Sequence, residues 1–471
     1  MDKQTFLAEF RRNVWLEFSL QKIILLLIVA GLTLAISLST DPTASDVVKI
    51  TINTALFIGL FGCISKVADS ITAEIGGHTW DFQRMSALPS TSIVFGKIFG
   101  ASSYIFVTVF VVLTLGFITL TNNINLADGN IYDMFFEKST LALACIVLGM
   151  GVTFIATIQI GRIMIRQKRI GDTLLKGLGI LIGSSAYFVI SETTKSRYGI
   201  DQIDWYGQSY HNTSLYYALL AVAIVWVAIG AIQSLKAELQ FKTFPTWWVA
   251  FMACVTFILC GFTPDYAESF EQILSYSAVC MFGVTIISAY TMILFEDLSI
   301  VRYRKLIAHI RARNDRETLI LMPRWIPGAF LALVALFVLA GVLVVNKIDE
   351  PYLLFGLLAA FFFVLRDIMI MHILVLRQPD KAYHLTFMIY LIILYGILPY
   401  FTIHVLGIDN PSVFYVDIES RTTGFMDALP AIIQAAGVTF LFARLLKRKG
   451  EDSLKSNEPI ATGWVASKED R

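Results

Sequence analysis

The sequence contains few charged residues and no strong surplus of either sign. Charged side chains occupy 15% of its 471 positions, whereas a typical soluble domain has about a quarter. Lysine and arginine total 37, and aspartate and glutamate total 36. The low charge content excludes an ordinary soluble domain, and the balance of signs gives no support for a nucleic-acid partner.

The sequence also lacks the patterns of disulfide frameworks, metal sites and nucleotide-binding loops. Its five cysteines all lie in apolar runs, where we expect small buried hydrophobes. Its six histidines are scattered without ligand spacing. No Gly-x-x-x-x-Gly-Lys-Ser/Thr occurs, and no polar segment is long enough for an ATPase domain. We therefore expect no cofactor, no metal and no catalytic site in this chain.

Long hydrophobic runs dominate the sequence instead. Hydrophobic residues make up 56%, and the mean hydropathy is +0.68. A bilayer core about 30 Å thick needs roughly 20 apolar residues in a helix. Such runs lie at 23–40, 47–65, 98–120, 139–161, 174–191, 215–236, 246–263, 273–295, 326–346, 351–376, 383–406 and 427–445. Because the runs are continuous rather than alternating, we expect an all-α polytopic membrane protein with about 12 transmembrane helices.

The placement of lysine and arginine predicts the orientation in the membrane. Basic residues gather in every second loop, and the loops between contain only Lys49, Lys138, Lys195, Arg197, Lys347 and Arg421. The basic loops should be cytoplasmic by the positive-inside rule. We therefore expect both termini in the cytoplasm, with 192–214 and 407–426 outside, in the cytoplasmic (inner) membrane of a bacterium.

Loop lengths predict two parallel six-span halves. The longest internal loop of each half follows its second span, at 66–97 and 296–325. Two short echoes agree in order: Arg-Ile-Met-Ile at 162 with Arg-Asp-Ile-Met-Ile at 366, and Gly-Ile-Asp at both 199 and 407. Six spans return a chain to its starting side, as a parallel duplication requires.

The predicted halves are 23–236 and 237–446, flanked by two segments outside the membrane. Residues 1–22 should form an amphipathic interfacial helix, because phenylalanine or valine recurs every four residues at Phe6, Phe10, Val14 and Phe18. A short solvated lead-in is the alternative for this segment. Residues 447–471 are polar and are expected to be a disordered cytoplasmic tail.

The loop at 66–97 contains the signals of a short helix. Gly76 and Gly77 should break the helix that leaves the membrane, and Thr79 can cap a new one with Asp81 in its first turn. Pro89 should stop that helix. Its apolar surface would come from Trp80, Met85 and Leu88.

These residues resemble a motif of the permease subunits of ATP-binding-cassette exporters of the second type. The motif has a glutamate after the second span, a Gly-Thr-Trp/Leu-Asp/Glu segment, a Leu-Pro stop, and Gly-Lys before the third span. The matching residues here are Glu74, Gly77, Thr79, Trp80, Asp81, Leu88, Pro89, Gly96 and Lys97. His78, between the glycine and the threonine, departs from the pattern.

The resemblance implies that the short helix docks in a groove of a separate ATPase subunit and transmits its closure to the spans. The chain would be two fused half-permeases forming one pathway for a small-molecule or lipid-like substrate. Two copies of the partner would bind ATP and Mg. We expect Trp80 to anchor this interface, because large aromatics often dominate binding energy.

The second loop departs further from the motif. It keeps an acidic residue, Glu296, and a Met322-Pro323 stop, but lacks the Gly-Thr-Trp-Asp core. Leu321 is its nearest apolar counterpart to Trp80. We therefore expect the second loop to couple more weakly.

Arg366 and Asp367 are an adjacent charge pair deep in a predicted span. A mid-membrane charge costs about 2.5–3.5 kcal/mol on insertion scales, so such residues often mark a transport pathway. Alternatively, Arg366 extends toward the interface with Asp367 as its partner. Both interpretations remain open from the sequence.

Two other classes of function compete with the exporter. A secondary transporter of the major-facilitator kind also has twelve spans, but its long loop usually follows span six rather than span two. A membrane-embedded enzyme needs clustered acid, base or metal-binding residues at membrane depth. The sequence offers only the pair Arg366 and Asp367 for that purpose.

Overall fold

The computed structural model describes residues 7–39, 44–77, 79–85, 88–123, 129–166, 172–193, 202–263, 269–295, 300–345, 351–377, 383–405, 414 and 424–455. Almost all of these residues are helical. They belong to two compact units, unit 1 (Met1–Thr243) and unit 2 (Phe244–Arg471). The division lies close to the boundary predicted after residue 236.

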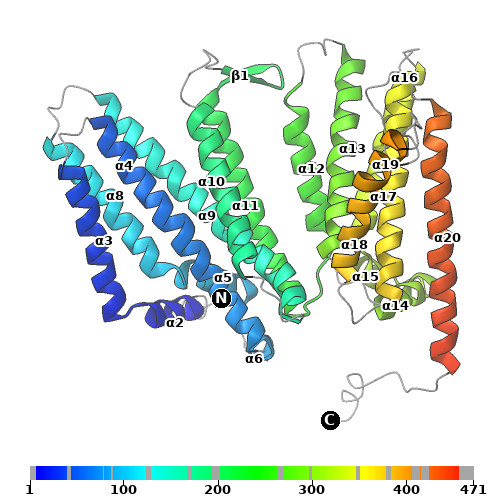
Figure 1. Cartoon of the computed structure of the whole chain (residues 1–471), viewed down its shortest axis with the longest axis horizontal. Helices are drawn as coiled ribbons and strands as arrows, with labels where there is room; N and C mark the ends of the chain where they lie inside the picture. The colour runs from blue at the N-terminus through cyan, green and yellow to red at the C-terminus, as the bar shows by residue number, and fades with distance from the viewer. Residues whose placement is uncertain are drawn as a thin grey trace. The chain divides into compact units, whose positions relative to one another are not determined.

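Unit 1 contains helices and one short hairpin (Figure 1). Its elements are α2 (Ala8–Glu17), α3 (Leu20–Ser39), α4 (Ala44–Phe57), the π-helix η1 (Ile58–Cys63), α5 (Ile64–Gly76), α6 (Trp80–Met85), α7 (Ser90–Phe95), the π-helix η2 (Gly96–Gly100), α8 (Ser103–Asn123), α9 (Gly129–Arg166), α10 (Asp172–Thr193), β1 (Gln202–Trp205), β2 (Gln208–His211) and α11 (Asn212–Glu238).

Unit 2 is helical throughout its described residues. Its elements are α12 (Thr246–Cys260), α13 (Phe270–Phe295), α14 (Ile300–Arg311), α15 (Asp315–Leu321), α16 (Trp325–Val345), α17 (Pro351–Arg377), α18 (Tyr383–Ile392), the π-helix η3 (Ile393–Ile397), α19 (Leu398–His404) and α20 (Phe425–Lys455).

Nine helices within the described ranges are long and apolar enough to cross a membrane. A bent pair, α2 with the first part of α3, is a tenth candidate, with 75° between its two segments. Two shorter apolar helices cover Gly179–Ser191 and Thr246–Cys260. The chain is therefore a multi-pass α-helical membrane protein, in which helices satisfy the backbone polar groups internally. Twelve spans and an internal duplication stay predictions.

The core of unit 1 forms where α4, α5, α8 and α9 pack together. Val48, Ile64, Val109 and Ile146 from these four helices are fully buried. In Figure 1, α2 lies across one end of this helical layer, and the β-hairpin lies at the other end. The element α2 and the short helix α6 therefore share one end of unit 1.

The hairpin between β1 and β2 is closed by two residues in the left-handed region. Tyr206 has φ 52° and Gly207 has φ 69°, as a type I′ turn requires. The strands pair antiparallel, with Ile203 opposite Tyr210. This hairpin lies in the segment that we predict to be outside.

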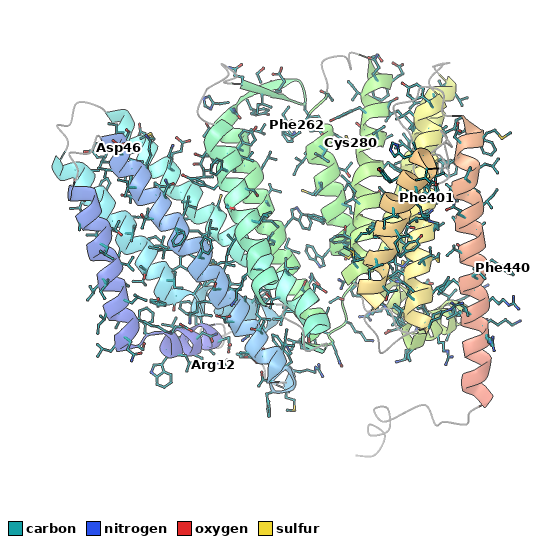
Figure 2. The ribbon with its side chains drawn as sticks, in the orientation of Figure 1. Arg12, Asp46, Phe262, Cys280, Phe401 and Phe440 are labelled. Atoms are coloured by element: carbon teal, nitrogen blue, oxygen red, sulfur yellow. The ribbon has the colours of Figure 1, made fainter. Side chains whose placement is uncertain are left out.

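In unit 2, α13 packs on α16, and α17 packs on α20. Phe440 of α20 points away from the rest of this unit and is 67% exposed (Figure 2), as expected of a lipid-facing side chain. Helix α20 continues to Lys455. The first part of the segment expected to be disordered is thus helical, and 456–471 lie outside the described residues.

Candidate functional site

Helix α5 ends where the two glycines predicted its end. It runs to Gly76, and the backbone N–H of Gly77 caps it by donating to the carbonyl of Ala73 at 2.9 Å. Glu74 lies in its last turn, past the predicted end of the span at residue 65. Thr79 directly precedes α6, and its carbonyl accepts from the backbone N–H of Phe82 at 3.1 Å. Its hydroxyl donates to the Glu74 carboxylate. The contact between Thr79 and Glu74 therefore connects the end of α5 to the start of α6 across the two glycines.

A buried ion cluster centres on Lys97. This side chain is 1% exposed, and its Nζ lies 2.9 Å from Glu74 Oε1 and 3.7 Å from Glu9 Oε1. Arg12 approaches the same two carboxylates at 3.3 and 3.4 Å. Lys97 also lies over the ring of Trp80, 5.9 Å from its centroid. The cluster therefore joins α2, the end of α5, the start of α6 and η2.

Helix α2 buries polar residues and exposes apolar ones. Glu9 and Asn13 are buried, whereas Trp15 and Leu16 are exposed, as is Phe18 directly after the helix. The Asn13 amide donates to the carbonyl oxygen of Gly96 at 3.2 Å and to Glu9. This inverted arrangement suits a helix whose outer face meets lipid and whose inner face meets the ion cluster.

Gly96 and Gly100 allow α2 to approach η2 closely. A Cβ at Gly96 would lie 2.7 Å from the backbone nitrogen of Phe10, and one at Gly100 would lie 2.9 Å from Asn13 Cβ. Small residues four apart provide such close helix contacts in membrane proteins. The glycines therefore bring Glu9 and Asn13 within reach of Lys97 and Gly96.

Trp80 does not face outward as an anchor. It is 6% exposed and belongs to the main core of unit 1, because its ring packs inside the bundle beside Lys97. The exposed apolar side chains of α6 are Phe82 and Met85, at 71% and 77%. This burial disagrees with the expectation of an exposed Trp80, and Phe82 and Met85 are the exposed apolar side chains on the same helix.

The other residues of the motif support α6 from both sides. Leu88 packs against the main core, and Pro89 precedes α7 as its N-cap. Arg84 Nε donates to the carbonyl of Leu239 at 3.1 Å, which ties α6 to the end of α11. Asp81 belongs to α6, but its side chain, like all of His78, lies outside the described residues.

The described residues of the second long loop, 296–325, form two short helices, α14 and α15. The Asn314 side chain caps α15 by accepting from the backbone N–H of Glu317 at 3.3 Å. Arg302 donates to the carbonyls of Leu321 and Met322, at 3.0 and 3.2 Å. Leu321 is partly buried, and Glu296 lies outside the described residues. This loop is thus held by a helix cap and by Arg302 rather than by a buried ion cluster like that of Lys97.

Arg366 and Asp367 form the centre of a buried network in unit 2. Arg366 Nε donates to Asp367 Oδ1 at 2.9 Å, and its other nitrogens donate to Gln434 at 2.5 Å and Tyr395 at 2.8 Å. Both charged residues are nearly inaccessible, at 2% and 0% exposed. Arg366 therefore does not extend to the interface, because all its partners lie within the bundle.

Tyrosines complete the coordination of Asp367. The hydroxyls of Tyr395 and Tyr390 donate to it at 2.6 and 3.2 Å, and that of Tyr290 lies at 3.5 Å. Tyr395 stands on η3, and π-helical turns often occur at functional sites. The network links α13, α17, α18, η3 and α20. Inside the bundle, the two opposite charges balance each other, and the tyrosines and Gln434 supply hydrogen bonds to them.

Several of these partners were not found from the sequence. Glu9 and Asn13 have the i, i+4 spacing of one helix face, but no pattern pairs that face with Lys97. The tyrosines and Gln434 lie in three predicted spans, none of which is the span of Asp367. A search for polar residues inside apolar runs would have identified them as candidates. Among the described residues, no group of histidine, cysteine or acidic side chains could hold a metal ion.

Neither family models nor curated proteins nor solved structures provide a match to this chain.

Proposed function

We propose that this protein is the transmembrane subunit of an ATP-binding-cassette exporter, coupled to a separate ATPase. The observation that carries the proposal is the Lys97 cluster, which joins α2, α5 and η2 to the base of α6. The exposed Phe82 and Met85 lie on that same short helix. A movement of α6 would therefore be transmitted through Trp80 to Lys97 and its buried ion pairs, and from there to α2, α5 and η2. Buried ion pairs hold their geometry better than a solvated loop does.

Chemically, α6 suits docking better than catalysis. Its exposed side chains among the described residues, Phe82 and Met85, are apolar, while its Arg84 is held by the end of α11. Two large exposed apolar side chains on a short cytoplasmic helix can fill a pocket on a partner. ATP hydrolysis and the Mg it requires would belong to that partner, expected in two copies, and the substrate would be a small or lipid-like molecule.

Site-specific crosslinking tests the docking. A photoreactive phenylalanine replaces Phe82 in the full chain, and the same replacement at Phe188 is the control. The two positions have similar exposure, 71% and 68%, but Phe188 lies on the apolar helix α10. We expect Phe82 alone to crosslink, in native membranes, to a protein that contains a phosphate-binding loop. Crosslinks from Phe82 only to lipid would count against the docking.

One observation favours a second candidate, a secondary transporter. The buried Arg366–Asp367 network is the kind of intramembrane charge site that ion-coupled transporters use. This candidate predicts that the purified chain alone produces substrate-dependent currents, driven by an ion gradient and lost in Asp367→Asn. Currents that require an ATPase and ATP would exclude it.

A further inference from the structure

A cavity of about 420 Å³ with charged residues in its lining opens between α2 and α5 in unit 1. The charged residues that line it are Arg12, Glu17, Lys66, Asp69, Glu74 and Lys97. Three of them are cations and three are anions, so the lining is neutral overall. A lining that offers both signs matches a ligand that itself carries both signs.

The charged side chains that line the cavity differ in their exposure to solvent. Lys97 and Glu74 are committed to the ion cluster and are 1% and 11% exposed. Arg12 and Asp69 are about half exposed, and Lys66 is 30% exposed. A carboxylate offers about four lone-pair sites and an ammonium three donors. Lys66 contacts Glu17 at 3.2 Å, and Lys22 contacts the same carboxylate at 2.5 Å. Asp69 contacts Lys176 at 2.6 Å. These contacts use only part of the lone-pair capacity of each carboxylate, so the outer residues keep capacity for a ligand.

An apolar surface begins beside this cavity. Leu16 lines the cavity and is 58% exposed, and the next helix, α3, exposes Leu20, Ile24 and Leu27 along its length. The chain bends by 75° between α2 and α3. The cavity with its charged residues thus meets an apolar helix flank at the bend between α2 and α3.

We propose that this cavity binds the headgroup of a phospholipid with a primary ammonium, with the acyl chains along α3. The phosphate would contact Arg12 and Lys66. The ammonium would contact Asp69 and Glu17, which accept hydrogen bonds that a quaternary ammonium cannot donate. The lipid comes from the leaflet in which α2 lies. The proposal rests on the cavity and the exposed α3 flank, and it does not depend on the transport function.

The test measures lipid binding to the full-length purified chain after delipidation. Native mass spectrometry compares phosphatidylethanolamine with phosphatidylcholine and phosphatidylglycerol. We expect phosphatidylethanolamine to bind about tenfold or more tightly than either, because each of the others loses charge-assisted hydrogen bonds. Equal binding of the three lipids, or a preference for phosphatidylglycerol, would overturn the proposal. Equally tight binding of soluble glycerophosphoethanolamine, which has no acyl chains, would refute the claim that the ligand is a membrane lipid.

The two ends of one helix provide a matched pair of variants. Lys66 and Asp69 are three residues apart in the continuous helix Ser45–Gly76, and so are Asp46 and Lys49 at its other end. Figure 2 shows Asp46 at the end of unit 1 opposite to Arg12. The double change Lys66→Gln with Asp69→Asn should weaken phosphatidylethanolamine binding about tenfold or more.

The control double change, Lys49→Gln with Asp46→Asn, removes the same charges far from the cavity. We expect it to leave lipid binding unchanged. If the Lys66 and Asp69 variant fails to fold, Arg12→Gln tests the phosphate contact without changing either of these residues, since the Arg12 side chain is 53% exposed. Wild-type binding in the cavity variant, or equal loss in the control, would refute the assigned site.

Discussion

Replacing Lys97 by methionine removes the only buried cation from the Lys97 cluster while keeping much of the side-chain volume. Lys97 lies 2.9 Å from Glu74 and 3.7 Å from Glu9, and both carboxylates are largely shielded from water. The variant leaves these two anions facing each other. Only Arg12, which is 53% exposed, remains to neutralise them.

The expected cost follows from this geometry. Breaking a buried ion pair by removing one partner typically costs about 3–5 kcal/mol, because the remaining charge is left unpaired. Arg12 contacts both carboxylates, so we expect the low end, about 3 kcal/mol. Adding Glu9→Gln and Glu74→Gln removes the unpaired charges. The triple variant should therefore recover all but about 1 kcal/mol.

Unfolding of the full chain in detergent micelles measures both variants, with helix content by circular dichroism as the folding control. The triple variant also separates the stability of the fold from the transmission of movement between α6 and the spans. It should be nearly as stable as the wild type. It should not transmit movement of α6 to the spans, because the ion pairs of the Lys97 cluster are removed. Equal stability of the single and triple variants would refute the assignment of the cost to unpaired carboxylates.

Three further predictions test the rest of the structure. Gly96→Val places atoms against the backbone of α2 and should cost about 1–3 kcal/mol, whereas Gly31→Val, with nothing within 4 Å of its Cβ, should be nearly neutral in the same unfolding assay. Arg366→Met should destabilise by about 3–5 kcal/mol, and adding Asp367→Asn should restore most of that loss; failure of this rescue would argue against a neutralising network. A cysteine at Ser209, in the hairpin, should react with an impermeant thiol reagent from outside intact cells, and protection there would reverse the predicted orientation.

The parts that the sequence predicts well depend on local signals. Apolar runs of about 20 residues predict membrane-crossing helices because the bilayer sets their length. Nine helices of the described residues have the required length and composition. The glycines after Ile75 identify the end of α5, because glycine readily ends a helix. Both signals lie within a few residues of the feature that they predict.

The parts that the sequence does not predict depend on contacts between distant segments. Trp80 resembles an exposed anchor in the sequence, but the packing of the bundle buries it beside Lys97. Helix α2 shows an apolar repeat, yet it buries Glu9 and Asn13, because a cation 84 residues or more away in the chain lies on that side. Asp367 likewise finds its tyrosines on other helices. Such pairings follow from tertiary structure and have no local pattern.

ATP hydrolysis that co-purifies with the tagged chain tests the central claim most directly. The chain is extracted from its own cell membranes in mild detergent, and the preparation is assayed before and after a wash that strips peripheral proteins. The account predicts ATPase activity before the wash, a co-purifying protein with a phosphate-binding loop, and loss of both after it. It also predicts that changing Phe82 and Met85 together to serine abolishes the co-purification. A preparation of the wild-type chain that is stable, active in transport and free of any ATPase would contradict the account.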